Sequence, residues 1–189
     1  MTTTFHRPTR LQGLLALSTL VLLGAAGIRA VQAADNATAS ATAVVLQPIA
    51  VTKSADLVFG NVVAGNGVVT VATDGARTKS GTAVLPSGVT AAAARFDVTG
   101  TGANTFSIDY TGSDSVLTDA SSNTMAVDWI TEAVATTTPT GKTDETTDAT
   151  TGTLTSGAAY IFVGGKLTVG SSQAAGTYTG VVKVTVAYN

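Results

Sequence analysis

The chain of 189 residues carries ten Lys or Arg against twelve Asp or Glu, contains no Cys, and has a single His, His6. Beyond residue 6 there is neither an imidazole nor a thiol, which excludes Ser-His-Asp and Cys-His catalysis, Cys/His zinc sites, haem ligation and iron–sulfur clusters from the remaining chain. The formal net charge is −2 and no basic cluster occurs, so the electrostatic footprint of a nucleic-acid-binding protein is missing.

Residues 1–33 have the three-part layout of a secretory signal peptide. Arg7 and Arg10 give a positively charged start, Leu11–Ile28 is an apolar run, and Val31–Ala33 places small residues at the cleavage position. We expect cleavage after this leader and export of the chain to the periplasm, the cell surface or the medium. The alternative is a retained membrane anchor, because a charged residue also follows the apolar run.

Cleavage of the 33-residue leader leaves 156 of the 189 residues, enough for one domain with a substantial core. Of the ten basic residues, Arg7, Arg10 and Arg29 belong to the leader, so seven remain against twelve acidic ones and the net charge becomes −5. No later apolar stretch is long enough to span a membrane. We therefore expect a single domain over residues 34–189, held by packing and hydrogen bonds without disulfides.

The first part of this domain, Asn36–Leu46, alternates in character. The interleaved Ser and Thr residues and the following Pro48 favour an extended strand over a helix. One face of that strand would carry only small apolar side chains, namely Ala37, Ala39, Ala41, Ala43 and Val45.

Period-two alternation and turn signals recur through the rest of the chain, with no sustained helical period. The strand candidates are residues 49–52, 56–60, 68–72, 82–85, 92–98, 105–110, 125–135, 160–163 and 166–169. Ala64–Gly67 and Gly164–Gly165 read as hairpin turns. About nine or ten such segments predict an all-β fold, an antiparallel β-sandwich.

The C-terminal residues form the clearest strand of the sequence. From Tyr178 onward, β-branched and aromatic residues alternate with mostly polar ones, as expected for a strand with one buried face. The face predicted to be buried consists of Tyr178, Gly180, Val182, Val184, Val186 and Tyr188.

The stretch at about 136–155 is almost wholly polar and predicts a solvated loop or a disordered insertion. Its acidic residues, Asp144, Glu145 and Asp148, match no calcium-loop spacing. No catalytic constellation occurs elsewhere, so we expect a protein without enzymatic activity, cofactor or metal.

Four stretches together resemble one family. They are Ala41–Thr52, Asp56–Gly60, Val163–Gly170 and Gly176–Tyr188, and they are similar to the exported bacterial domain-of-unknown-function family 4402 over essentially the whole mature chain. The early Phe-Gly and the ending Gly-x-Tyr with its alternating strand also resemble spore-coat U-like proteins and chaperone–usher pilins.

This resemblance implies an immunoglobulin-like sandwich and a structural or surface-fibre subunit. In pilins the fold ends one strand short, and an N-terminal segment of the neighbouring subunit supplies the missing strand. Residues 34–46 are then either such a donated segment or the domain's own first strand. The partners implied are copies of the same chain and a periplasmic chaperone.

A different function is a surface module that binds a carbohydrate or another ligand through its loops. The only Trp, Trp129, is the one candidate for a sugar-stacking platform, and its other interpretation is an anchor in the core. The sequence thus leaves a structural subunit and a binding module as the two functions to be tested.

Overall fold

The computed structural model describes residues 35–189, and the predicted signal peptide lies outside them. The chain divides into two units, one ending at Thr42 and the other running from Ala43 to Asn189, and each is described by itself. Residues 35–42 are exposed and belong to no strand. Nowhere within residues 35–189 is there a helix long and apolar enough to cross a membrane.

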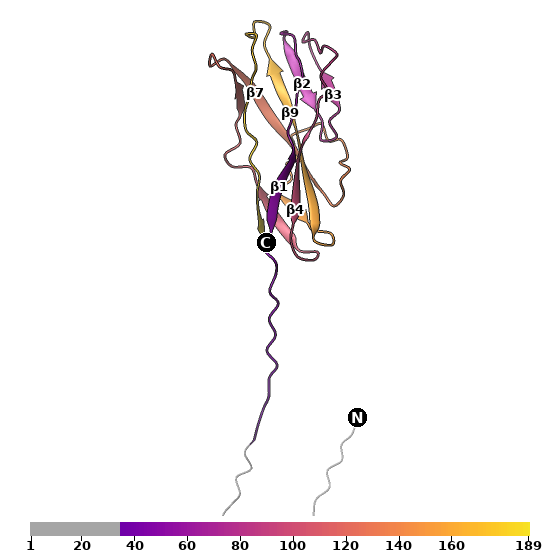
Figure 1. The fold of residues 1–189 in the computed structure, drawn as a ribbon, viewed down its shortest axis with the longest axis vertical. Coiled ribbons are helices and arrows are strands. Elements are labelled where there is room, and N and C mark those ends of the chain that lie inside the picture. Colours follow the sequence, from indigo (N-terminus) through magenta and orange to yellow (C-terminus); the bar gives the residue numbers. More distant parts are fainter. Residues whose placement is uncertain (1–34) are drawn as a thin grey trace, which may run out of the picture. The chain divides into compact units, whose positions relative to one another are not determined.

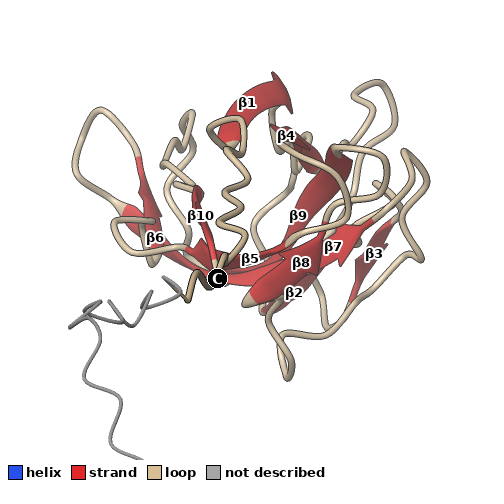
Figure 2. Ribbon diagram, turned by 90° about the horizontal axis from the view of Figure 1, so that it is seen from below, coloured by secondary structure: helices blue, strands red, loops and turns tan. Residues whose placement is uncertain are grey.

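The unit Ala43–Asn189 is built from ten strands joined by turns and loops, and Figure 2 shows no helix in the part of the chain that it describes. The strands are β1 (Ala50–Ala55), β2 (Gly67–Val71), β3 (Arg77–Lys79), β4 (Ala94–Thr99), β5 (Thr105–Asp109), β6 (Val116–Thr118), β7 (Thr124–Val134), β8 (Thr151–Thr153), β9 (Ala158–Val169) and β10 (Thr185–Tyr188).

The strands form two antiparallel sheets. In the seven-stranded sheet the long strand β9 is central: β7 pairs along one side of it, while β4 and β2 pair with successive parts of the other side. β1 and β3 lie outside β4 and β2, and β6 extends β7. The second sheet has the order β10–β5–β8 (Figure 2). The predicted all-β, immunoglobulin-like antiparallel sandwich is confirmed.

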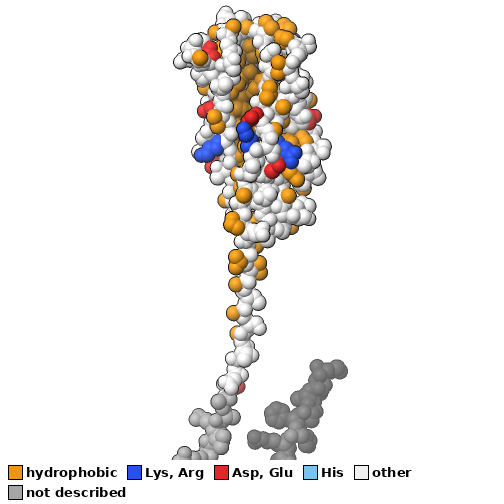
Figure 3. Space-filling model, in the orientation of Figure 1, with side chains coloured by type: hydrophobic (Ala, Val, Ile, Leu, Met, Phe, Trp, Pro, Cys, Tyr) orange, Lys and Arg blue, Asp and Glu red, His pale blue; other side chains and the backbone are white. Residues whose placement is uncertain are grey.

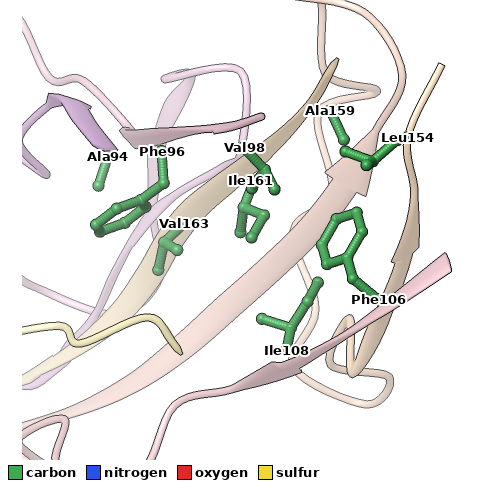
Figure 4. Packing of buried hydrophobic residues seen from close by; sticks show 9 residues of the cluster. All are labelled: Ala94, Phe96, Val98, Phe106, Ile108, Leu154, Ala159, Ile161 and Val163. Carbon is green, nitrogen blue, oxygen red and sulfur yellow. The ribbon is translucent and has the colours of Figure 1, made fainter. Parts of the chain in front are cut away.

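Side chains from the facing strands fill the interior in two clusters. The first lies between β4, β5 and β9, where Phe106 and Ile108 point toward Ile161 (Figure 4); it comprises Ala94, Phe96, Val98, Phe106, Ile108, Leu154, Ala159, Ile161 and Val163. The second comprises Val69, Ala83, Leu117, Met125, Val127, Leu167 and Val169. Trp129 packs against both clusters, so it joins them.

The hairpin predicted at Gly164–Gly165 is wrong, because β9 runs through both glycines without a break. A Cβ on Gly164 would lie 2.2 Å from the carbonyl oxygen of Val71, and a Cβ on Gly165 would lie 2.9 Å from the Phe59 ring. The two glycines therefore serve the close approach of neighbouring chain segments instead of a turn.

The hairpin predicted at Ala64–Gly67 is also wrong in its pairing. Strand β2 pairs with β3 and β9, whereas the segment around residues 56–63 makes only isolated bridges, Val58 with Ala92 and Val63 with Val84. The predicted strand at 82–85 is likewise reduced to the bridge at Val84. Irregular pairing in this region creates the feature described next.

Candidate functional site

A long apolar groove opens over the second core cluster. Its volume is about 1090 Å³, and it lies between two stretches of chain, residues 53–64 and residues 173–182. Figure 3 shows hydrophobic side chains inside this hollow in the upper part of the molecule. The floor consists of Ala94, Phe96, Leu117, Met125, Trp129, Leu167 and Val169. Core side chains of the sandwich thus line an open surface.

The first edge of the groove is the chain that follows β1. Leu57, Phe59 and Val62 turn toward the interior and are half-buried. From the outer side, the Arg77 guanidinium donates hydrogen bonds to the carbonyl oxygens of Phe59 at 2.9 Å and Asn61 at 3.3 Å. These bonds hold the edge in place without using its inner side.

A glycine permits this arrangement. Gly60 has φ +76°, which side-chain-bearing residues rarely adopt, and a Cβ at Gly60 would lie 2.4 Å from an Arg77 nitrogen. The glycine thus both turns the first edge and leaves room for the guanidinium. Sequence reasoning gave this Phe-Gly pair no structural role beyond ending an apolar run.

The second edge is the stretch 177–184, just before β10. The predicted alternation of the C-terminal strand is seen here: Tyr178, Val182, Val184, Val186 and Tyr188 are half-buried, and the residues between them are exposed. Gly180 is the exception to the prediction, because it belongs to the face predicted to be buried but is exposed and lines the groove. Regular strand pairing, however, is confined to Thr185–Tyr188, which pairs with Phe106–Asp109 of β5.

Further up, the second edge is fastened along one side only. Thr179 forms a bridge with Thr118, the Asp114 carboxylate accepts the Val181 N–H at 2.6 Å, and the Ser113 hydroxyl accepts the Lys183 N–H at 2.9 Å. The odd-numbered residues therefore direct their backbone groups away from the groove. In an extended chain the intervening residues direct theirs to the opposite side.

That opposite side is unpaired. Within residues 35–189, the backbone groups of Gly180, Val182 and Val184 have no hydrogen-bond partner, and on the facing edge the same holds for Leu57 and Val62. Both edges of the groove are thus open sheet edges, with backbone donors and acceptors free for another strand.

The predicted strand-exchange segment forms no strand within residues 35–46. Residues 35–46 are exposed and pair with no strand, and Val44 and Val45 of the domain unit are 85% and 93% exposed. The structure therefore shows Ala37, Ala39, Ala41, Ala43 and Val45 without a strand partner.

Trp129 contributes to the floor as a half-buried side chain. Its ring packs against both core clusters, and its Nε1–H donates to the Asp114 carbonyl oxygen at 2.9 Å. The same Asp114 also binds the second edge through its carboxylate. Trp129 thus supports the groove wall as well as lining its floor.

The charged groups of the groove are few and lie at its lower mouth. Lys53 and Asp56 form an ion pair at 2.6 Å, and both side chains are well exposed. A pair of this kind contributes little to stability because water screens it. The three acidic residues of the polar loop have separate partners: Asp144 accepts from Thr146, Glu145 pairs with Lys166, and Asp148 accepts from Thr131. No cluster of metal-binding side chains occurs within residues 35–189.

The best-buried carboxylate lies elsewhere, on β7. Glu132 is 8% exposed; burial alone would raise its pKa, but hydrogen bonds from the Thr73 hydroxyl and the Thr140 N–H outweigh that effect and lower the pKa. Lys142 donates its N–H to Thr73 at 2.8 Å and its ammonium group to the Thr131 carbonyl oxygen. This network fastens the polar loop, whose end forms β8, onto the sandwich.

A burial effect also acts on Tyr110, whose pKa is raised to about 12. Its hydroxyl donates to the Ala149 carbonyl oxygen at 3.1 Å. Neither Glu132 nor Tyr110 lines the groove.

Comparison with known proteins gives one match. No curated protein and no solved structure matches this chain significantly. The model of the family described as domain of unknown function DUF4402 matches residues 49–188, which includes both edges and the floor of the groove. The chain belongs to the DUF4402 family.

Proposed function

We propose that this protein is an exported, non-enzymatic structural subunit of the cell surface that assembles by strand complementation. The observation that carries the proposal is the groove: two open sheet edges stand on either side of a floor made of core side chains. An extended segment placed between them would hydrogen-bond to the edges and cover the floor. The sandwich is one strand short of closure at this point.

The dimensions of the groove also favour an extended polypeptide. Its volume of about 1090 Å³ exceeds the roughly 300–1,000 Å³ of ordinary small-molecule pockets. The floor offers apolar side chains, and unpaired backbone groups line both edges. Backbone hydrogen bonding along the edges supplies the polar contacts that a strand needs.

An open groove of this kind is a liability for a free subunit. Exposed core side chains and unpaired edges favour non-specific association. A periplasmic chaperone that covers the groove until assembly is therefore part of the proposal. If the subunit needs this chaperone, the exported chain should accumulate poorly when it is produced without one.

The test compares two chains, the exported protein and a variant that lacks residues 34–46. We expect the first to form oligomers that grow with concentration in size-exclusion chromatography with light scattering, and the second to remain monomeric. A synthetic peptide of residues 34–47 should raise the melting temperature of the truncated variant. A stable monomer from the exported chain, with no response of the truncated variant to the peptide, contradicts the proposal.

A ligand-binding surface module is the second candidate, and the position of Trp129 in the groove floor is the observation that favours it. Aromatic rings at a groove floor can stack against sugars. Titration of the truncated variant with a panel of glycans, followed by Trp fluorescence, distinguishes the two functions. Saturable quenching by a glycan would support the module, and no response would leave the structural subunit.

A further inference from the structure

We infer that the groove receives residues 37–46 of a second copy of this chain, running antiparallel to the edge 177–184, so that subunits join head to tail. This inference rests on the proposed function and adds the partner segment, its direction and its register. It depends on three features of the structure: the shape of the donor segment, the closed lower end of the groove, and the alternation along the second edge.

The donor segment suits the groove in its side chains. Its apolar face offers only small residues up to Val45, while Thr38, Ser40 and Thr42 lie on the other face. Large side chains such as Phe59, Phe96 and Trp129 already line the groove, so an incoming backbone can approach closely only if it brings small side chains. The other face, which also carries Val44 and Leu46, would remain in water.

The direction follows from the two ends of the groove. At the lower end, near the C-terminus in Figure 1, the Tyr188 hydroxyl donates to the Gln47 carbonyl oxygen at 3.0 Å and accepts the Thr101 N–H at 2.7 Å. The start of β1 and the end of β10 thus meet there. The subunit's own chain occupies the space into which a second domain would have to fit.

The upper end is bordered by Val63 and Ala64 on one edge and by residues 173–177 on the other, and the C-terminus lies at the opposite end of the domain (Figure 1). A donor segment continues directly into β1 of its own domain, so its C-terminal end must leave the groove at this upper end. The donor therefore runs upward, whereas the edge 177–184 runs downward toward β10. The two are antiparallel.

The register follows from side-chain direction. Residues directly opposite each other in an antiparallel pair point to the same face of the sheet. The inward-facing Val45, Ala43 and Ala41 therefore lie opposite even-numbered edge residues. Among the pairings that meet this condition, we propose the one that uses the full edge, with Val45 opposite Tyr178 at the upper end and Ala41 opposite Val182. On the outer face, Val44 then lies beside Thr179, and Ser40 lies beside Lys183.

Head-to-tail contact of this kind is heterologous and leaves a donor segment free at one end and a groove free at the other. Such contacts build open filaments unless the rotation between subunits closes a ring. Each added subunit brings a new free groove and a new free donor segment. The length of the filament is therefore set by the supply of subunits and not by the geometry of the contact.

Disulfide trapping tests the direction, since the chain has no Cys and engineered cysteines would have no competitors. Two full-length variants, each carrying two substitutions, probe the antiparallel arrangement: Val44→Cys with Thr179→Cys, and Ser40→Cys with Lys183→Cys. Opposed residues of this type have Cα atoms ~4.5 Å apart, within the ~4.4–6.8 Å that a disulfide spans. The matched controls exchange the partners: Ser40→Cys with Thr179→Cys, and Val44→Cys with Lys183→Cys.

After export and mild oxidation, we expect a ladder of covalent oligomers on a non-reducing gel for the first two variants and for neither control. A ladder from the controls alone overturns the direction while leaving strand complementation intact. A cross-link confined to the monomer shows that the chain occupies its own groove and overturns the second copy. Oligomers that no pair traps overturn the register and the donor segment. Absence of oligomers altogether contradicts the proposed function as well.

Discussion

The two halves of the sandwich differ in how their cores are covered. In the closed half, around Phe106 and Ile161, β10 pairs with β5 and the side chains are sealed between sheets. In the open half, around Leu117 and Leu167, the stretch before β10 is held only by an isolated bridge and side-chain hydrogen bonds, and the core faces the groove. The same C-terminal strand pattern runs through both halves. Burial is thus decided by the neighbours of a strand and not by its own sequence alone.

The largest expected effect comes from removing one aromatic ring from each half and comparing the losses of stability. Phe106 is 0% exposed, so Phe106→Ala should lower the free energy of unfolding by about 3–5 kcal/mol. Phe59 is half-buried beside the groove, so Phe59→Ala should lower the free energy of unfolding by only about 1–1.5 kcal/mol. Full burial of a Phe side chain contributes ~1.5–3 kcal/mol. Denaturant unfolding of the monomeric fractions measures both. Equal losses would show that the groove is closed in solution.

A second experiment closes the open half. A copy of residues 34–46 joined after Asn189 by a short flexible linker enters the groove from its lower end, in the direction inferred above, at an effective concentration of roughly millimolar. Burial of Val45 of the copy contributes about 1.5–3 kcal/mol, and each kcal/mol raises the melting temperature by ~2–4 °C in a domain of this size. Calorimetry should show the rise, and chromatography a loss of oligomers.

Two substitutions within the grafted copy provide the control. The change Ala41→Asp would bury an unpaired charge and should cancel the gain, whereas Thr42→Asp places the same charge on the solvent face and should preserve most of it. If both variants keep the higher melting temperature, the graft does not occupy the groove.

A smaller contrast comes from two glycines. A Cβ on Gly152 would lie 2.3 Å from the buried Phe106 ring, so Gly152→Ala should cost about 1–3 kcal/mol through overpacking of the closed half. A Cβ on Gly180 would lie 2.7 Å from the end of the Leu117 side chain, which can move into the groove. We therefore expect Gly180→Ala to lower the free energy of unfolding of the monomer clearly less than Gly152→Ala does. Urea unfolding of the two variants measures both losses. A larger loss for Gly180→Ala would contradict the open groove.

The smallest effect concerns acid. The lowered pKa of Glu132 means that its carboxylate stabilises the fold at pH values above the ordinary Glu pKa, and that this contribution disappears as the pH falls through the lowered value. Hydrogen bonds to a charged group contribute ~1.5–3 kcal/mol. In Glu132→Gln, unfolding measured from pH 7 to pH 3 should lose less stability on acidification than in the parent. An identical pH profile would show that the network of Thr73 and Thr140 does not depend on the charge.

The sequence alone predicts much of the sandwich but not its gap. Alternation at Tyr178–Tyr188 correctly identifies which side chains turn inward, because that depends only on an extended backbone. Whether Val182 is paired on both sides depends on segments more than a hundred residues away, and no local pattern encodes it. The glycines at 164–165 show the same limit. A tight turn and a close contact with Val71 both require glycine, so the sequence alone does not tell the two apart.

In a filament assembled as proposed, the hydrogen bond between Tyr188 and Gln47 would carry load. Tension applied to the segment before β1 reaches the domain at Gln47, and the Tyr188 hydroxyl there ties that residue to the last strand. The last strand continues upward into the edge that would grip the next subunit, so force passes from one junction to the next along a single stretch of chain. Its hydrogen bonds to β5 lie across the direction of pull and are loaded together in shear. In such a filament the hydrogen bond of Tyr188 to Gln47 would share the load with the covalent path through β1, which pairs with β4 in the main sheet.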